Sequence, residues 1–196
     1  CSAVDTWIGS LREAVGEDIE IALDLNFNFK TGGYIKVGNI LEQYNLMWLE
    51  IDTYDPAALR QIKDSVITPI TSCENLYGTR QYLPFFEKHA MDTVSIDVIW
   101  NGFTCSKKIA DMAELYEMNI SPHNYNGLLS TFISMQFCSL VPNLHLAEID
   151  VDDVPWREEL FTNLPIIEDG YLSIPTEPGW GTDLNEKALI KYKWPK

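Results

Sequence analysis

Short apolar segments of strand character alternate with longer segments of helical periodicity along most of this chain. Apolar side chains recur every three or four positions in the longer segments, and they alternate or cluster in the shorter ones. The pattern predicts helices over 4–15, 34–44, 56–66, 78–90, 102–117 and 128–140. It predicts strands over 19–27, 47–51, 69–74, 93–100, 119–123 and 144–149. The chain therefore contains six expected strands, with helices between them and one helix before the first.

Each expected strand ends near one acid or histidine, and these polar residues follow one another at intervals of 23 to 26 residues. They are Asp24, Glu50, Glu74, Asp97, His123 and Glu148. A strand, a helix and two loops need about this length of chain, so the interval is typical of repeated β/α units. The carboxyl ends of such strands meet at one mouth, where barrel enzymes place their active sites.

Six strands are fewer than the eight that close a (β/α)₈ barrel, and six open strands leave two unpaired edges. Either the strand count is wrong, the sheet is open, or the chain is a piece of a longer protein. The start on a helix favours the last interpretation. We expect an α/β fold with an incomplete TIM-type barrel over 1–150. A C-terminal wrapping segment over 151–196, with short β pieces around 172–174, should complete the same domain.

Composition narrows the class of protein. The chain has 196 residues, 46% of them hydrophobic, which is enough to build a globular core. Its net charge of −15 disfavours binding to nucleic acid or to anionic lipid. The chain has no apolar run long enough to cross a membrane and no secretory signal at its start, so we expect a cytoplasmic protein.

The cysteines do not indicate a zinc site or a disulfide framework. Cys1, Cys73, Cys105 and Cys138 are widely spaced and form no C-x-x-C pair. We expect free thiols. Cys73 should face away from the neighbouring Glu74 and pack as an inert side chain, and we also expect His145 to be structural.

Three of the strand-end acids suggest a metal site. Asp24, Glu50 and Glu74 lie on successive expected strands, and three adjacent carboxylates cannot all stay ionised without a cation. An all-oxygen set of ligands suits Mg²⁺ better than Zn²⁺. Asn26, two residues after Asp24, could donate a hydrogen bond to a substrate.

The other three strand-end residues suggest proton transfer. Asp97 could fix the tautomer of His123 and make it a general base or acid. If its pKa is raised, Glu148 could donate a hydrogen bond to a developing oxyanion. Together with a metal, this set suits removal of a proton next to a carboxylate. Taken singly, each residue is more often a solvated loop residue or a cap, and an α/β module that only holds a cation or a basic ligand is the non-enzymatic alternative.

Short motifs around these residues carry a family resemblance. They are Leu23-Asp24-Leu25-Asn26, Trp48-Leu49-Glu50, Cys73-Glu74-Asn75-Leu76, Ile96-Asp97-Val98, Ser121-Pro122-His123-Asn124, Ala147-Glu148, the segment 169–175 and Pro178-Gly179-Trp180-Gly181. In order and spacing they resemble the enolase superfamily, in its mandelate racemase and muconate lactonizing enzyme branch. The resemblance covers nearly the whole chain and identifies its strands with strands three to eight of the family barrel.

The resemblance implies a Mg²⁺ ion held by Asp24, Glu50 and Glu74, an Asp97–His123 dyad, and Glu148 near the substrate. It implies a lyase or isomerase that removes the α-proton of a small-molecule carboxylate, in a homo-oligomer. An acid-sugar dehydratase is the leading expectation, because the context of His123 and the stretch 153–157 look most like those enzymes. A racemase or epimerase of the same family is the alternative.

The chain also departs from the family pattern. It reads Glu50-Ile51-Asp52 where the family usually carries Glu-Pro or Gln-Pro, and Asn101-Gly102-Phe103 replaces a glycine pair. The family's capping domain, first strand and lysine-bearing second strand have no counterpart before residue 1, and Lys30 and Lys36 are no substitutes. The second base is therefore not identified, and a catalytically silent barrel fragment stays an alternative.

Overall fold

A parallel five-stranded sheet forms the centre of the protein. We describe it from a computed structural model, which covers residues 2–150 and 154–193. The strand order is β1-β2-β3-β4-β5. The strands are β1 Ala22–Asp24, β2 Trp48–Glu50, β3 Ile70–Ser72, β4 Thr93–Ser95 and β5 Asn119–Ser121. Consecutive strands therefore pair in parallel, which requires the predicted crossover between each pair.

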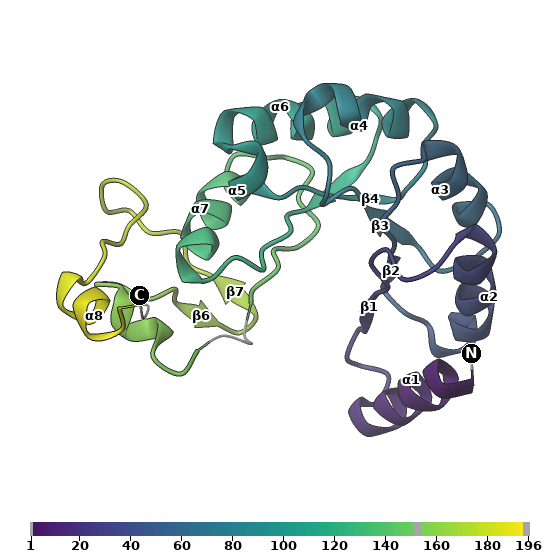
Figure 1. Cartoon of the computed structure of the whole chain (residues 1–196), viewed down its shortest axis with the longest axis horizontal. Coiled ribbons are helices and arrows are strands. Elements are labelled where there is room, and N and C mark those ends of the chain that lie inside the picture. The colour runs from purple at the N-terminus through teal and green to yellow at the C-terminus, as the bar shows by residue number, and fades with distance from the viewer. Residues whose placement is uncertain (1, 151–153, 194–196) are drawn as a thin grey trace.

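Helices lie between the strands of this sheet and around it. They are α1 Ser2–Val15, α2 Thr31–Leu41, α3 Pro56–Lys63, α4 Gly78–Glu87, α5 Val98–Asn101, α6 Phe103–Leu115 and α7 Leu128–Cys138, with the 3₁₀ helix η1 Glu42–Tyr44 after α2. Figure 1 shows α2, α3, α4 and α6 along the outside of an open arc, with the strands on its inner side and the two chain ends far apart. The α/β architecture is thus as predicted, in the form of a curved, open sheet.

Side-chain alternation along each strand divides the core from the concave face. Leu49, Val94 and Ile120 are fully buried and pack beneath the helices. Their neighbours point the other way, and Glu50 and Ser95 line the inner face. Because polar side chains lie on the inner face, the arc presents a hydrophilic concave surface.

A buried arginine fixes the entry into the first strand. Arg12 on α1 is 8% exposed and donates hydrogen bonds to the backbone carbonyls of Gly16, Ile19, Tyr44 and Asn45. Its guanidinium thus joins the segments that precede β1 and β2.

The predicted strand over 93–100 is wrong beyond Ser95. Asp97 caps α5 instead, and its Oδ1 accepts a hydrogen bond from the backbone N–H of Trp100 at 2.7 Å. Capping by an aspartate outweighs the apolar alternation of this segment, because it satisfies an otherwise unpaired N–H group.

The sixth predicted strand, 144–149, is reduced to a single parallel bridge between Ile120 and Leu144. Ile120 N–H donates to Asn143 O at 2.9 Å, and His145 N–H donates to Ile120 O at 2.8 Å. The segment therefore continues the parallel order of the sheet for one bridge. His145 also packs edge-on against Trp48, with ring centroids 5.5 Å apart.

The C-terminal segment contains short elements. They are the 3₁₀ helix η2 Arg157–Leu160, the antiparallel hairpin of β6 Ile167–Glu168 and β7 Tyr171–Leu172, and the helix α8 Glu186–Lys191. The predicted β piece around 172–174 is confirmed only at Leu172. Helix α8 was not predicted, because its six residues are too few to show periodicity, although Asn185 accepts a capping hydrogen bond from Ala188 N–H.

The thiols follow expectation where the structure describes them. Cys73, Cys105 and Cys138 are free, whereas Cys1 lies outside the described residues. Asp153, the first residue of the stretch 153–157, also lies outside them. Cys73 is 2% exposed, and burial raises the pKa of its thiol. None of the described helices is long and apolar enough to cross a membrane.

Candidate active site

The carboxyl ends of the strands carry the candidate residues. β1 ends at Asp24 and β2 ends at Glu50, and the register places these two residues opposite each other. Glu74, Asp97 and His123 each lie two residues beyond the end of β3, β4 and β5 respectively. Because the strands are parallel, their carboxyl ends lie at the same edge of the sheet. All five residues therefore lie at the same mouth.

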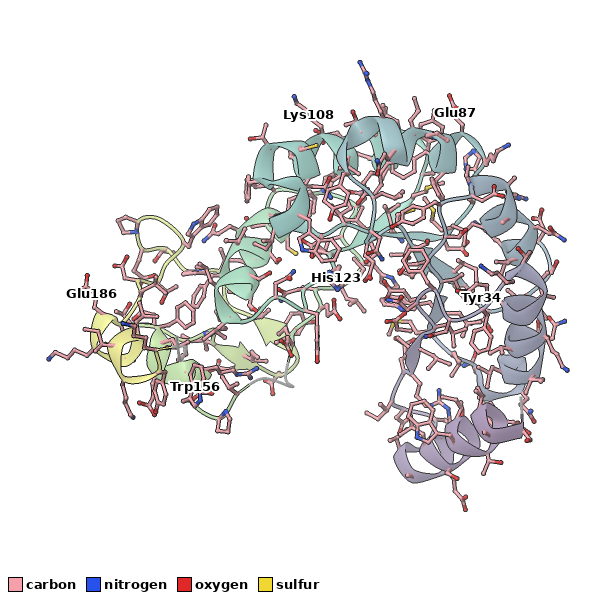
Figure 2. All side chains as sticks on the ribbon, viewed as in Figure 1. Tyr34, Glu87, Lys108, His123, Trp156 and Glu186 are labelled. Carbon is pink, nitrogen blue, oxygen red and sulfur yellow. The ribbon has the colours of Figure 1, made fainter. Side chains whose placement is uncertain are left out.

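One open cavity of about 470 Å³ lies at this mouth. It is lined by Asp24, Asn26, Glu50, Glu74, Trp100, His123, Tyr125, Asn126 and Glu148. Six of the seven residues expected from the sequence therefore share one cavity, and the seventh, Asp97, lies behind His123. Figure 2 shows His123 on the inner side of the arc, whereas Glu87 and Lys108 lie on the outer side.

Asp97 and His123 form a closely hydrogen-bonded pair. His123 Nδ1 lies 2.7 Å from Asp97 Oδ2, and Asp97 is completely buried. The same Oδ2 accepts a hydrogen bond from Asn126 Nδ2 at 2.7 Å, while Oδ1 accepts the N–H of Trp100. Both oxygens of Asp97 are thus occupied, so this carboxylate holds the imidazole in one orientation and leaves Nε2 facing the cavity.

The surrounding carboxylates favour the protonated form of His123. Burial lowers its pKa, but the hydrogen bond to Asp97 and the charges of Glu74 and Glu148 outweigh burial and raise the pKa to about 9. Glu74 Oε2 lies 3.3 Å from His123 Nε2. The imidazole therefore carries a positive charge near neutral pH while these carboxylates have no other counter-ion.

Asp24, Glu50 and Glu74 form the acidic side of the cavity, where their like charges repel one another. Burial, followed by the charges of Asp24 and Glu74, raises the pKa of Glu50 to about 8. Burial also raises the pKa of Glu74, against the opposing effect of His123. Oε1 of Glu50 is buried without any hydrogen-bond partner. Such an orphaned oxygen among like charges is costly unless a proton or a cation compensates it.

The acidic side fits a magnesium ion by its chemistry. Within the described residues, no three carboxylate, imidazole or thiol groups lie close enough together to enclose an ion in their present positions. Asp24, Glu50 and Glu74 nevertheless supply only oxygen donors, which Mg²⁺ prefers. The unpartnered Oε1 of Glu50 is the observation that supports the fit, because a cation would supply the missing partner.

Glu148 is fixed by the loop that follows His123. Its Oε2 accepts the backbone N–H of Asn124 at 2.6 Å. The buried side-chain amide of Asn124 donates to Glu148 O at 2.9 Å and to Thr131 Oγ1 at 3.0 Å. The end of the sixth segment is therefore joined to the His123 loop although it forms no regular strand.

Asn26 reaches the cavity from the turn after β1, and not from the strand that the sequence predicts over 19–27. It does not lie on the strand, because β1 ends at Asp24, and its backbone has a left-handed φ of 43°. Asn26 N–H donates to Asp24 Oδ1 at 2.7 Å, and Asn26 Oδ1 accepts the N–H of Phe27 at 2.7 Å. This turn orients Asp24 and leaves the Asn26 amide nitrogen for other partners.

Sequence reasoning missed five residues that lie in or beside the cavity, namely Trp100, Tyr125, Asn126, Asp52 and Asn75. Trp100 packs against the His123 ring at 5.5 Å between centroids, and Asn126 holds Asp97. Asp52 and Asn75 lie next to Glu74, and burial raises the pKa of Asp52 to about 7. Asp52 was visible as a departure from the family pattern, whereas Asn126 gave no signal apart from its nearness to His123.

The fold and this mouth define the class of protein. Over residues 7–188 the chain matches the family described as enolase C-terminal domain-like, and the chain belongs to this family. The membership confirms the resemblance to the enolase superfamily that the sequence motifs carry.

Several known proteins are similar to the chain. It is 29% identical to D-xylonate dehydratase of Haloferax volcanii over 93% of the chain and 45% of that protein. It is 28% identical to arabinonate dehydratase of Saccharolobus solfataricus, over 94% of the chain and 50% of that protein. The chain thus spans about half the length of these curated relatives.

Solved structures extend the comparison. One is from Burkholderia xenovorans strain LB400, is described as a candidate L-alanine-DL-glutamate epimerase, and contains magnesium and fumarate. It is 44% identical to the chain, with a TM-score of 0.92, over 94% of the chain and 46% of that protein. A mandelate racemase/muconate lactonizing enzyme-like protein from Rubrobacter xylanophilus is 30% identical, with a TM-score of 0.89, over 96% of the chain and 49% of that protein.

Proposed function

We propose that the chain carries the catalytic mouth of a Mg²⁺-dependent enzyme that removes the α-proton of a small carboxylate, with acid-sugar dehydration as the leading activity. The observation that carries the proposal is the Asp97–His123 pair, which faces the strained acids Glu50 and Glu74 across one cavity. The two dehydratase relatives named above support a sugar acid as the substrate class.

The acidic side would hold the ion. Asp24, Glu50 and Glu74 are the proposed ligands, and Asn26 is a proposed contact for the substrate. When bound, Mg²⁺ would neutralise these acids and the substrate carboxylate and would stabilise the charge that develops when the α-proton leaves. Neutralising Glu74 would also weaken the field that holds a proton on His123, which must be neutral to act as a base.

His123 would perform both proton transfers. Its Nε2 takes the α-proton, and the C–H electron pair remains on the substrate as an enediolate. The electrons then form the Cα–Cβ double bond while the β C–O bond breaks, and the imidazolium returns its proton to the departing hydroxyl group, releasing water. Asp97 keeps Nδ1 protonated throughout, and Glu148 would face the developing oxyanion.

Epimerisation is a second candidate, which the 44% identical Burkholderia structure favours. Inversion at the α-carbon needs a second base on the opposite face of the substrate. The curated relatives named above are dehydratases of sugar acids, which places dehydration first.

The test is a turnover assay of the chain with Mg²⁺ in D₂O. The substrates are a panel of sugar acids and the dipeptide Ala-Glu, and the readouts are keto-acid formation and deuterium at the α-carbon. We expect keto acid from a sugar acid, with the rate lowered at least about a hundredfold in His123→Asn. His145→Asn, outside the cavity, is the matched control and should retain the rate.

The other outcomes have defined meanings. Incorporation of deuterium into the dipeptide, without formation of keto acid, would indicate epimerisation in place of dehydration. Equal rates for wild type and His123→Asn would refute the proposed base. No reaction with any substrate would favour the catalytically silent barrel or the cation-binding module.

A further inference from the structure

Asp52 is a buried acid beside the proposed metal ligands. It lies two residues beyond the end of β2 and is 3% exposed. Its backbone N–H donates to Asn26 O at 3.3 Å, which connects it to the loop after β1. Its carboxylate faces the other way, toward the loop after β3, so Asp52 lies between the loops that carry the first and third proposed ligands.

One amide group connects Asp52 with Glu74. Asn75 Nδ2 donates one hydrogen bond to Asp52 Oδ2 at 3.1 Å and another to Glu74 Oε1 at 2.9 Å. Both protons of this amide are therefore used, each on a different carboxylate. The amide bridges two groups that would otherwise repel each other.

Glu74 is held from two opposite sides. Oε1 accepts from Asn75, while Oε2 lies 3.3 Å from His123 Nε2. This contact with His123 would draw the carboxylate toward the dyad. The hydrogen bond from Asn75 opposes that movement, but only if the Asn75 side chain is itself fixed.

The backbone next to Glu74 also needs support. Cys73 has a φ of 89°, in the left-handed region that residues with a side chain rarely occupy. Burial raises the pKa of Asp52, and the Cys73 backbone, which lies near its carboxylate, opposes this rise. Asp52 accepts one hydrogen bond from this loop, which comes from Asn75, the residue after Glu74.

We propose that Asp52 is a positioning residue that keeps Glu74 directed at the metal site, by fixing the amide of Asn75. The role of Glu74 as a ligand rests on the proposed function. The orientation of Asn75 and Glu74 by Asp52 does not depend on it, and the two parts can be tested separately.

The first experiment is a calorimetric titration of Mg²⁺ into wild type, Asp52→Ala, Asn75→Ala and the double variant. We expect each single change to weaken Mg²⁺ binding about tenfold. The double variant should bind no more than about twofold more weakly than the weaker single variant, because both changes remove the same contact. Asp64→Asn, an exposed acid at the end of α3, is the control for loss of one negative charge and should bind like wild type.

Two results would overturn the proposal. Unchanged affinity of Asp52→Ala would remove the role of Asp52, and losses that multiply in the double variant would make Asp52 an independent charge or ligand. If Asp52→Ala fails to fold, Asp52→Leu takes its place, because leucine has a similar branched shape and offers no acceptor to Asn75.

The second experiment needs no metal. NMR should find the side-chain amide protons of Asn75 protected from exchange with solvent in metal-free wild type and unprotected in Asp52→Ala. Equal exchange in the two proteins would refute the proposal. If wild type binds no Mg²⁺ while this protection is lost as expected, the assigned metal site fails and the positioning role of Asp52 stands.

Discussion

The two sides of the cavity are organised in opposite ways. On the side of the dyad, both oxygens of Asp97 have partners, and Nδ1 of His123 is held 2.7 Å from Asp97 Oδ2. On the acidic side, Glu50 carries an orphaned buried oxygen and a pKa raised to about 8. The described residues give both oxygens of Asp97 a partner, whereas they leave Oε1 of Glu50 without one. Preorganisation of one side and strain on the other is what a metal-assisted proton transfer requires.

The largest expected effect comes from breaking the organised side. Asp97→Asn replaces an acceptor by an amide whose NH₂ group faces His123 Nδ1, so the imidazole loses its fixed tautomer. We expect the rate of α-proton exchange in D₂O to fall about a thousandfold. Thermal unfolding would verify that the variant is folded.

Asp92→Asn is the matched control, because Asp92 precedes the same strand at the opposite end and pairs with Lys63. Its rate should stay within about twofold of wild type. If Asp97→Asn lost no more than this control, the dyad would not be the catalytic element.

The next effect comes from relieving the strained side. The pKa of Glu50 is raised in the folded state, so this group favours folding below about pH 4.5 and loses that contribution as the pH rises through about 8. Glu50→Gln removes this dependence of folding stability on pH. We expect the metal-free variant to exceed wild type in free energy of unfolding by about 2 kcal/mol at pH 8.5, and by much less at pH 5.

Urea unfolding at both pH values with a chelator measures this difference. Glu87→Gln, which changes a glutamate on α4, should follow wild type at each pH. A Glu50→Gln variant less stable than wild type at pH 8.5 would show that Glu50 is already compensated without a metal.

The smallest effect concerns the support of the dyad. Asn126→Ala removes one donor from Asp97 Oδ2 and leaves the bonds from His123 and Trp100. We expect the exchange rate to fall about tenfold, the cost of one hydrogen bond to a charged group. A loss as large as that of Asp97→Asn would indicate that Asn126 acts on the substrate itself.

The sequence correctly predicted those helices and strands that show a local pattern of apolar and polar residues. Alternating β/α periodicity predicted the parallel strands, and constant spacing marked the residues that end them. Boundaries were less accurate, because a cap at Asp97 ends the apolar run of β4 early and creates α5. In the last segment, pairing at Leu144 is limited to one bridge, which no local pattern reports.

The residues that support the site could not be predicted in the same way. Asn75 and Asp52 are 23 positions apart and meet only because two loops converge at the mouth. Asn126 reaches Asp97 across 29 positions. Such contacts depend on the tertiary arrangement of loops, whereas a residue at the end of a strand is placed by the strand itself.

A calorimetric titration of Mg²⁺ tests the central claim most directly. Wild type should bind one ion, and Glu74→Gln should bind it at least about tenfold more weakly, because an amide oxygen replaces a charged ligand. Glu87→Gln, the control on the outer surface, should bind as wild type does. Equal affinity of wild type and Glu74→Gln for Mg²⁺ would contradict the proposed metal site.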